Sequence, residues 1–401
     1  MSNDQKDNQT RFLSQRVLQS KRIPSIRDSH EIDAVRNSGV DVLDLKGAPR
    51  EPMPTHVLKA VMEAAESIGS YPSSKGLYSF RSALSSMMKD QDNAEVDPET
   101  EILVTNGGMQ AAYTVFTGIL DPGDEIIIPS PGFFFDEPVK LVGGNPVLVP
   151  MDEEEGYRLD LKRIERAITP RTKAVMVMTP QNPTGYVITE SDLSGLAELA
   201  TRHDLLLICD ESFRRFVFDG RKHLSPISLP EIRDRTIMVR SFTKTFALSG
   251  WRVGYIVAPA QMINSFLIAQ EWATISINPV SQSAAEAAVT GPQDWLIPLN
   301  QAYQTNRDIV CKAIEDIDGL WCNPPQGLPL LWINISALGI SGYEFSDILL
   351  KQYGINSTAG EYFNDPVPHV RIPYGGDKSV AQELGKRLAK AAEQCLKAAK
   401  T

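Results

Sequence analysis

Residues 241–254 read SFTKTFALSGWRVG. The segment sets Lys244 among small and hydroxyl-bearing residues directly after the apolar run Thr236–Ser241, and Arg252 follows it. A lysine amine in such a place can form an imine with an aldehyde, and Ser241 and Arg252 can bind a phosphate beside it. Taken alone, the segment is equally compatible with a surface lysine in a polar loop, so the rest of the chain has to decide.

The composition is that of an ordinary globular enzyme, with 401 residues, 42% hydrophobic and 22% charged. A net charge of −10 without a basic stripe argues against nucleic acid as a partner. No apolar run is long enough for a membrane span, and residues 1–8 are polar rather than signal-like. The four cysteines are scattered, with no C-x-x-C pair. We therefore expect a cytoplasmic protein without a disulfide framework or a metal site.

Short apolar runs alternate with helical stretches between residues 101 and 258. Runs of this kind are typical of a mostly parallel sheet that helices cover on both faces. The predicted strands are Glu101–Thr105, Glu125–Pro129, Pro146–Pro150, Ala174–Thr179, Leu205–Asp210, Thr236–Ser241 and Arg252–Ala258.

The pattern changes after Pro292, where long helices surround two strand candidates, Leu328–Ile335 and His369–Pro373. We expect an α/β fold with a mostly parallel seven-stranded sheet in a large domain and a smaller α+β domain. The predicted boundaries are residues 1–50 for an N-terminal arm and part of the small domain, 51–292 for the large domain and 293–401 for the rest of the small domain.

Polar motifs follow several of these strands, and sheets of this kind bind ligands at the carboxyl ends of their strands. The motif TNGGMQ at residues 105–110 has glycines that let a phosphate approach the amides of Gly108, Met109 and Gln110, although a tight turn explains it equally well. Asn182, in QNPTG at residues 181–185, can donate to a phenolate oxygen; the alternative is a plain turn.

Asp210 ends the very apolar run that starts at Leu205. A carboxylate buried there is costly unless a cation pairs with it, and a protonated pyridine nitrogen is such a cation; the alternative is a helix N-cap. Phe133 or Phe134 can stack on a ring or belong to the core. An aldehyde, a phosphate and a pyridine ring together describe pyridoxal 5′-phosphate, next to which a lysine serves first as nucleophile and then as proton carrier.

These motifs, in this order and spacing, resemble the class I/II aminotransferases, the aspartate aminotransferase-like pyridoxal-phosphate enzymes of fold type I, from about Val42 to the C-terminus. The resemblance implies a homodimer with shared active sites. For the cofactor ring, it implies that Lys244 forms the Schiff base, Asp210 faces the pyridine nitrogen, Asn182 binds the phenolate oxygen and Phe133 stacks on the ring. For the phosphate, it implies binding by Ser241, Arg252 and the amides of Gly108, Met109 and Gln110, and by Tyr71 of the neighbouring subunit. For the substrate, it implies that Arg371 pairs with the α-carboxylate, that Asn182 also contacts the substrate and that Gly47 lies over it.

The chain departs from the family pattern at three places. Phe213 stands where the family usually has a tyrosine that donates to the phenolate oxygen. Met109 replaces a serine or threonine that often contacts the phosphate. The loop 360–363, GEYF, differs from the small-residue loop commonly found there, which indicates a reshaped substrate side.

We therefore expect a pyridoxal-phosphate enzyme that transfers an amino group between an L-amino acid and a 2-oxo acid. The alternative is elimination or replacement, cyclisation or oxidation of an amino acid on the same fold. A regulatory protein that has lost catalysis is disfavoured, since Lys244 and Asp210 are both present. The sequence does not identify the substrate, because no second arginine can be assigned to a distal carboxylate; a merely solvated position is the alternative for Arg214 or Arg215.

Overall fold

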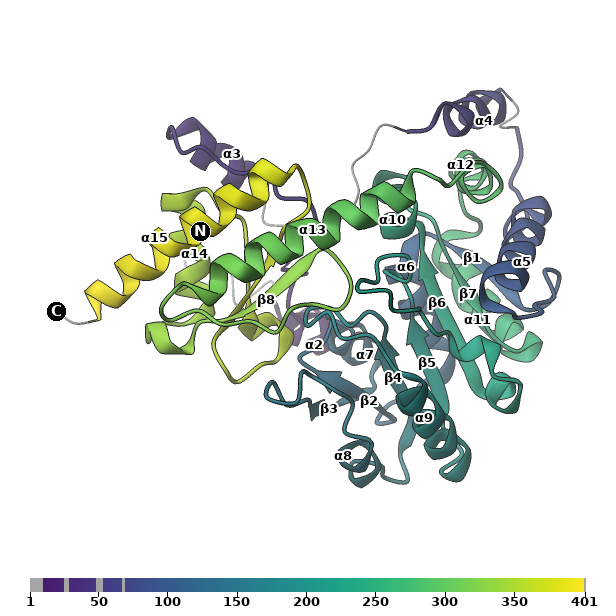
Figure 1. Ribbon diagram of the computed structural model, residues 1–401. Coiled ribbons are helices and arrows are strands. Elements are labelled where there is room, and N and C mark those ends of the chain that lie inside the picture. The colour runs from purple at the N-terminus through teal and green to yellow at the C-terminus, as the bar shows by residue number, and fades with distance from the viewer. Residues whose placement is uncertain (1–9, 25–28, 48–52, 67–68, 400–401) are drawn as a thin grey trace.

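The computed structural model describes residues 10–24, 29–47, 53–66 and 69–399. Parts of the predicted N-terminal arm, residues 1–9 and 25–28, and the predicted loop residues Ala48 and Pro49 lie outside this range. Figure 1 shows a large twisted sheet in teal and green with helices around it, and beside it a second group of elements in yellow-green and yellow. The described residues include no helix with the length and apolar composition needed to cross a bilayer.

The larger sheet has seven strands among the described residues, in the order β1-β7-β6-β5-β4-β2-β3. Only β7 runs against its neighbours, β1 and β6, and the other pairs are parallel. The short connection from β6 to β7 explains the exception, because a parallel crossover needs a much longer segment. The prediction of a mostly parallel seven-stranded sheet is confirmed. The strands are β1 (Ile102–Thr105), β2 (Glu125–Ser130), β3 (Asn145–Pro150), β4 (Thr172–Met178), β5 (Leu206–Asp210), β6 (Thr236–Ser241) and β7 (Gly254–Val257).

Both faces of this sheet are buried, which is why its strands are apolar at successive positions. On β4, Val175 and Val177 join one core cluster, while Ala174 and Met176 join another on the opposite face. The first cluster includes side chains of α9, and the second includes side chains of α6, α7 and α11. Alternate side chains of a strand point to opposite faces, so a strand covered on both sides has no polar alternation.

The helices of the described residues are bounded by recognisable sequence signals. A capping box of Thr189 and Asp192 starts α9, and a second one of Ser341 and Glu344 starts α14. The α-helices are α2 (Gln15–Gln19), α3 (Ser29–Asn37), α4 (Thr55–Ala65), α5 (Tyr78–Asp92), α6 (Gly107–Ile119), α7 (Asp136–Val142), α8 (Leu161–Arg166), α9 (Glu190–Arg202), α10 (Phe242–Thr245), α11 (Ala260–Thr274), α12 (Pro279–Thr290), α13 (Leu296–Glu315), α14 (Gly342–Tyr353) and α15 (Lys378–Ala398).

A smaller antiparallel sheet has the order β8-β10-β9 within the described part of the chain. Strands β8 (Leu330–Asn334) and β10 (His369–Pro373) match the two predicted candidates, whereas β9 (Thr358–Ala359) was not predicted. Two residues are too few to show a period in the sequence. Side chains of this sheet pack on α13, α14 and α15. Lys46 also pairs with Gly375 through two backbone hydrogen bonds of 3.0 Å, which ties residues before α4 to this group.

Candidate active site

The polar motifs singled out in the sequence follow β1, β4, β5 and β6. These four strands run in the same direction, so their carboxyl ends meet at one edge of the sheet. An edge of this kind is where open α/β sheets bind ligands. The site therefore gathers residues that are far apart in the chain.

One corner of the site is built from the start of α6, Ser241 and Arg252. Gly107 has a φ of +80°, and a Cβ there would come within 2.5 Å of Nη2 of Arg252. A Cβ on Gly108 would lie 3.2 Å from that of Ser241. The first backbone N–H groups of a helix lack partners inside the helix and attract anions. Together with the exposed guanidinium of Arg252, they form a corner suited to a phosphate.

Met109 and Gln110 continue the first turn of α6. The side-chain oxygen Oε1 of Gln110 accepts a hydrogen bond from the backbone N–H of Asn106. The Gln110 side chain therefore bends back to the start of the helix. Its buried side-chain nitrogen has no hydrogen-bond partner in the described residues. The Met109 side chain offers no hydrogen-bond donor, so only its backbone can serve an anion.

Lys244 lies on α10, a single turn that begins directly after β6. Ser241 caps this turn by accepting a hydrogen bond of 3.2 Å from the Thr243 N–H. The Lys244 Nζ donates to the carbonyl oxygen of Gly47 over 3.4 Å, and it lies 5.3 Å from the centre of the Phe213 ring. Gly47 thus lies next to the lysine, and its place over the substrate stays a prediction.

Asp210 ends β5 with only 4% of its surface exposed. Its Oδ1 accepts a hydrogen bond of 2.8 Å from the Ser212 N–H, but no lysine, arginine or histidine of the described residues forms an ion pair with it. Burial raises the pKa of Asp210 to about 6, although the Ser212 bonds act in the opposite direction. The carboxyl group bonds within a loop rather than at a helix N-terminus, so the N-cap alternative is wrong.

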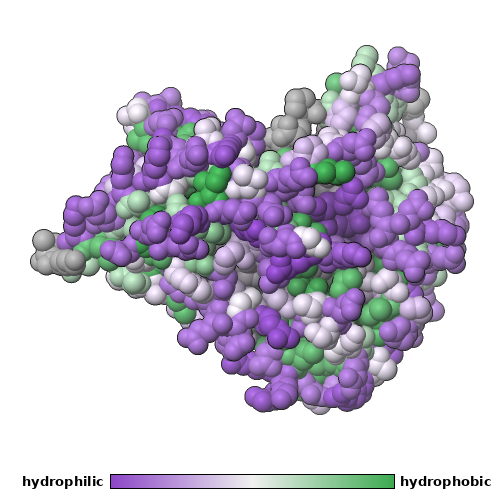
Figure 2. Space-filling model, in the orientation of Figure 1, coloured by the Kyte–Doolittle hydropathy of each residue, from purple (hydrophilic) through white to green (hydrophobic). Residues whose placement is uncertain are grey.

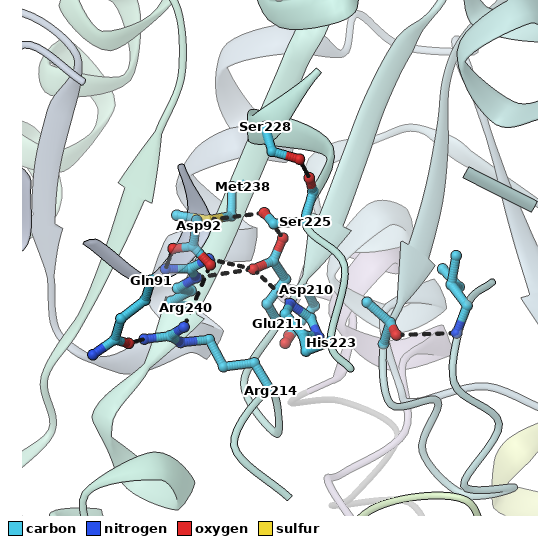
Figure 3. A network of polar contacts seen from close by, with 12 residues as sticks. Gln91, Asp92, Asp210, Glu211, Arg214, His223, Ser225, Ser228, Met238 and Arg240 are labelled. Atoms are coloured by element: carbon cyan, nitrogen blue, oxygen red, sulfur yellow. Dashed lines mark hydrogen bonds and ion pairs between the residues drawn. The ribbon is translucent and has the colours of Figure 1, made fainter. Parts of the chain in front are cut away.

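The next residue, Glu211, is part of a buried ion-pair network (Figure 3). Its Oε2 accepts hydrogen bonds of 2.9 and 2.7 Å from Arg240 on β6 and lies 3.1 Å from His223 Nε2. Arg240 also donates to Asp92 at the end of α5 over 2.7 Å. Burial opposes ionisation of Glu211, but Arg240 and His223 hold its pKa below the usual range.

Arg214 joins the same network and corrects one expectation. It is 6% exposed, donates to Gln91 over 2.6 Å and pairs with Asp92 at 3.4 Å. Burial lowers its pKa to about 10. The alternative that Arg214 is merely solvated is therefore wrong. Arg215 donates to Gln91 and to Gln293, each over 3.1 Å, so it too has side-chain partners rather than water alone.

Arg371 lies on β10 and is 7% exposed. Its guanidinium donates over 3.1 Å to the Asn182 Oδ1 and over 3.1 Å to the Thr358 Oγ1, while its buried Nε has no partner within the described residues. Its partners are neutral, and burial lowers its pKa to about 10. A planar fork with neutral partners and an unused donor is suited to a carboxylate.

Aromatic rings surround this guanidinium. Its carbon lies 4.9 Å from the centre of the Phe363 ring and 6.0 Å from that of Phe134. Phe133 lies next to Phe134, at 5.0 Å between ring centres, and packs on the cluster that contains Phe213. Sequence reasoning missed Thr358, whereas Phe363 belongs to the loop that was expected to reshape the substrate side. The departure of residues 360–363 from the family pattern was the local signal for Phe363, and Thr358 had none.

Tyr71 has a different place from the other expected residues. It lies between α4 and α5, and 79% of its surface is exposed. Within one chain it is therefore not enclosed by the site, in keeping with a residue expected to act on a neighbouring subunit.

The donors and charges of this site fit pyridoxal 5′-phosphate. The N-terminus of α6 with Arg252 suits the phosphate, and the buried carboxyl of Asp210, without a cationic partner in the described part of the chain, suits the protonated ring nitrogen. Two buried donors have no partner within the described residues, namely Gln110 Nε2 on α6 and Arg371 Nε on β10. A buried donor without a partner is uncommon in native structures, and a ligand removes the anomaly.

Comparisons with known proteins show the family and the fold of this chain. The profile of the family "Aminotransferase class I and II" matches residues 41–388. An aspartate aminotransferase of Pyrococcus abyssi is 33% identical over 356 residues, 87% of this chain and 91% of the relative. Aromatic-amino-acid aminotransferase 2 of Thermococcus litoralis is 32% identical, covering 86% and 90%. The structure of an aspartate aminotransferase from Thermus thermophilus with maleate superposes with a TM-score of 0.89 at 32% identity, covering 94% of this chain and 99% of that one.

Proposed function

This chain belongs to the class I and II aminotransferases, and on that premise we propose that it works with pyridoxal 5′-phosphate joined to Lys244. Two observations carry the proposal together: Lys244 follows strand β6 next to the Gly47 carbonyl, and Asp210 ends the neighbouring strand β5, buried and without a cationic partner in the described residues. When bound, pyridoxal 5′-phosphate supplies an aldehyde that condenses with amines and a protonated ring that accepts electrons from the substrate Cα.

The residues of this chain then have separate roles. Asp210 keeps the ring nitrogen protonated by offering a carboxylate in a buried place, where the pair is strong. Asn182 donates to the phenolate oxygen from its amide nitrogen, since its Oδ1 already accepts from Arg371. Ser241, Arg252 and the amides of Gly108, Met109 and Gln110 hold the phosphate, and Phe133 packs against the ring.

Lys244 moves the proton. Its free amine would serve as the general base that takes the proton from the substrate Cα and as the general acid that later gives it up, while the cofactor would supply the electron-accepting ring. Arg371 binds the α-carboxylate with its fork and so sets the orientation of the Cα–H bond towards Lys244. Gly47 lies over the bound substrate, next to the lysine.

We propose that the active form is a homodimer in which Tyr71 reaches the phosphate in the partner subunit. Large apolar side chains are exposed on the same part of the described chain, with Met62 on α4 69% exposed and Trp272 on α11 90% exposed. A homodimer interface would bury side chains of this kind, since contiguous apolar patches mark protein interfaces. Co-expression of Lys244→Ala with Tyr71→Phe subunits tests this, because hybrid dimers contain one intact site and should regain activity that neither variant has alone.

We also propose the division into a cofactor-binding part, residues 51–292, and a smaller part, residues 293–401 with residues 1–50. The faces of the larger sheet pack on helices from α4 to α12, and the smaller sheet packs on later ones. The cytoplasmic location stays a prediction from the sequence.

Borohydride reduction of the enzyme with pyridoxal 5′-phosphate tests the central proposal. We expect a phosphopyridoxyl group on the peptide that contains Lys244, and none on that peptide in Lys244→Ala. Lys351→Ala, at an exposed position of α14, is the matched control and should still be labelled at residue 244. Labelling of other lysines alone would overturn the proposal.

Phe213 favours a second candidate within the same fold, namely elimination, replacement, cyclisation or oxidation of an amino acid. The ring next to Lys244 lacks the hydroxyl that the family usually offers to the phenolate oxygen. Formation of pyridoxamine phosphate from an amino acid supports transamination. Release of ammonia or consumption of oxygen supports the second candidate.

A further inference from the structure

A cavity of about 170 Å³ lies next to Phe134, one of the aromatic rings that surround the Arg371 guanidinium. Most of its lining is apolar, and residues 21–24 of the N-terminal segment close one side. Its walls include Met109 and Tyr113 of α6, Phe134, Pro138 and Leu141 of α7, and Tyr362.

The cavity shares walls with the groups proposed to hold the substrate. Phe134 lines the cavity, and its ring centre lies 6.0 Å from the Arg371 guanidinium carbon. Met109 lines it from the first turn of α6, where the phosphate is expected. A substrate whose carboxylate is on Arg371 therefore has the cavity next to its side chain.

The acidic residues of the cavity are already engaged. Lys140 donates over 3.0 Å to Asp136 and over 3.0 Å to Glu137. The other Glu137 oxygen accepts the backbone N–H of Lys21 over 2.9 Å, and Asn364 donates to Asp136 over 3.2 Å. Each carboxylate thus has two partners, but the two share the single positive charge of Lys140, so a cationic side chain is the competing class that the test below has to exclude.

A substrate side chain that carries a second carboxylate also lacks a suitable partner in this cavity. The basic residues that line the cavity, Lys21 and Arg22, are exposed to solvent, whereas a carboxylate in an apolar cavity needs a desolvated partner. An apolar cavity with its charges paired or solvated is matched by an apolar group.

We propose that this cavity receives the side chain of the amino-acid substrate and that the preferred class is large and apolar, above all aromatic. The proposal rests on the proposed function for the placement of the carboxylate. Its size agrees, since a dry cavity of about 150 Å³ lined by apolar side chains is known to hold a benzene ring. Tyr113, Phe134 and Tyr362 provide aromatic faces for such a ring.

Carboxylates that lack the amino group test the proposal, because they bind without reacting. Calorimetric titration of the enzyme with bound pyridoxal 5′-phosphate compares 3-phenylpropanoate, succinate, 5-guanidinopentanoate and propanoate. We expect 3-phenylpropanoate to bind at least about tenfold more tightly than each of the others, the order of difference that a filled apolar pocket provides. Tighter binding of succinate or of 5-guanidinopentanoate would overturn the proposal.

Leu141→Trp fills the cavity and should weaken 3-phenylpropanoate at least about tenfold relative to propanoate. The matched control is Ile297→Trp, at a 62% exposed position of α13 outside the cavity, which should leave both affinities as they are. Unaltered relative affinity in Leu141→Trp would refute the assignment of the cavity. Amino transfer is measured separately with phenylalanine and alanine, so its absence refutes the proposed reaction while the affinities still judge the substrate class.

Discussion

The end of β5 carries two neighbouring carboxylates with the same burial and opposite surroundings. Asp210 is 4% exposed and Glu211 is 1% exposed. Glu211 has Arg240, His223 and Ser225 as partners, whereas Asp210 accepts a backbone N–H and has no cationic partner among the described residues. Successive residues of a strand point to opposite faces, so the two carboxylates belong to different environments.

The same contrast holds for two buried arginines. Arg240 pairs with Glu211 and Asp92, while Arg371 bonds only neutral groups and keeps one donor unused in the described part of the chain. A buried charge that has an opposite charge as partner is part of the folded structure, because removing either partner strongly destabilises the fold. A buried charge without an opposite charge is costly in the empty protein and becomes favourable when a ligand supplies the partner. The comparison therefore separates binding residues from structural ones.

The largest expected effect is the loss of stability in Glu211→Gln. This change leaves the Arg240 charge buried with one partner fewer, and removal of one member of a buried ion pair costs about 3–5 kcal/mol. Urea unfolding of the protein with cofactor removed measures it. The matched variant Asp210→Asn should not lose stability at neutral pH. Equal losses in both variants would remove the distinction between the two carboxylates.

Arg371→Leu should act on the reaction rather than on the fold. Truncation of a buried group that pairs with a ligand charge costs about 2–5 kcal/mol, which corresponds to a fall in kcat/KM of about 30- to 5,000-fold. Steady-state kinetics with the preferred amino donor measure this fall. The urea midpoint should fall less than in Glu211→Gln, and a larger fall would make Arg371 a structural residue like Arg240.

Asp210 also predicts a distinct pH dependence. Its pKa in the folded protein is about 6, above the ordinary value near 3.8, so the folded state binds more protons than the unfolded state between these values. The contribution of Asp210 to the stability of the cofactor-free protein should therefore fall as the pH rises from 4 to 6, by up to about 3 kcal/mol. Asp210→Asn should lack this fall.

Unfolding at a series of pH values, with and without pyridoxal 5′-phosphate, measures the difference between wild type and Asp210→Asn. The advantage of the variant should appear above pH 6, vanish near pH 4, and shrink when the cofactor supplies a cation. Glu211 contributes in the opposite direction, because its pKa is lowered in the folded state and its contribution is lost as the pH falls below the ordinary glutamate value. An advantage of the variant that stays constant with pH would contradict the role given to Asp210.

The sheet was predictable from the sequence because its strands are continuous apolar runs between turns. The positions of Lys244, Asp210 and Asn182 at strand ends were predictable for the same reason. Pairing between distant residues was not, since the bond between Arg371 and Asn182 and the pair between Glu211 and Arg240 depend on how strands are ordered. One signal was present: Arg240 interrupts the apolar run of β6, and a charge in such a run indicates a buried partner.

The smallest expected effect belongs to Phe213→Tyr. This change restores the tyrosine that the family usually has and tests whether its hydroxyl alters the protonation of the site. The Lys244 Nζ lies 5.3 Å from the ring centre, within the range of a cation–π contact. An added hydroxyl offers a donor on this side of the site, and we expect the pH midpoint of the cofactor absorbance to move down by about one unit or less, at most about 1.4 kcal/mol. Phe213→Leu removes the ring without adding a hydroxyl and should not lower the midpoint. A shift of the same sign and size in both variants would show that the ring, and not the missing hydroxyl, sets the protonation of this site.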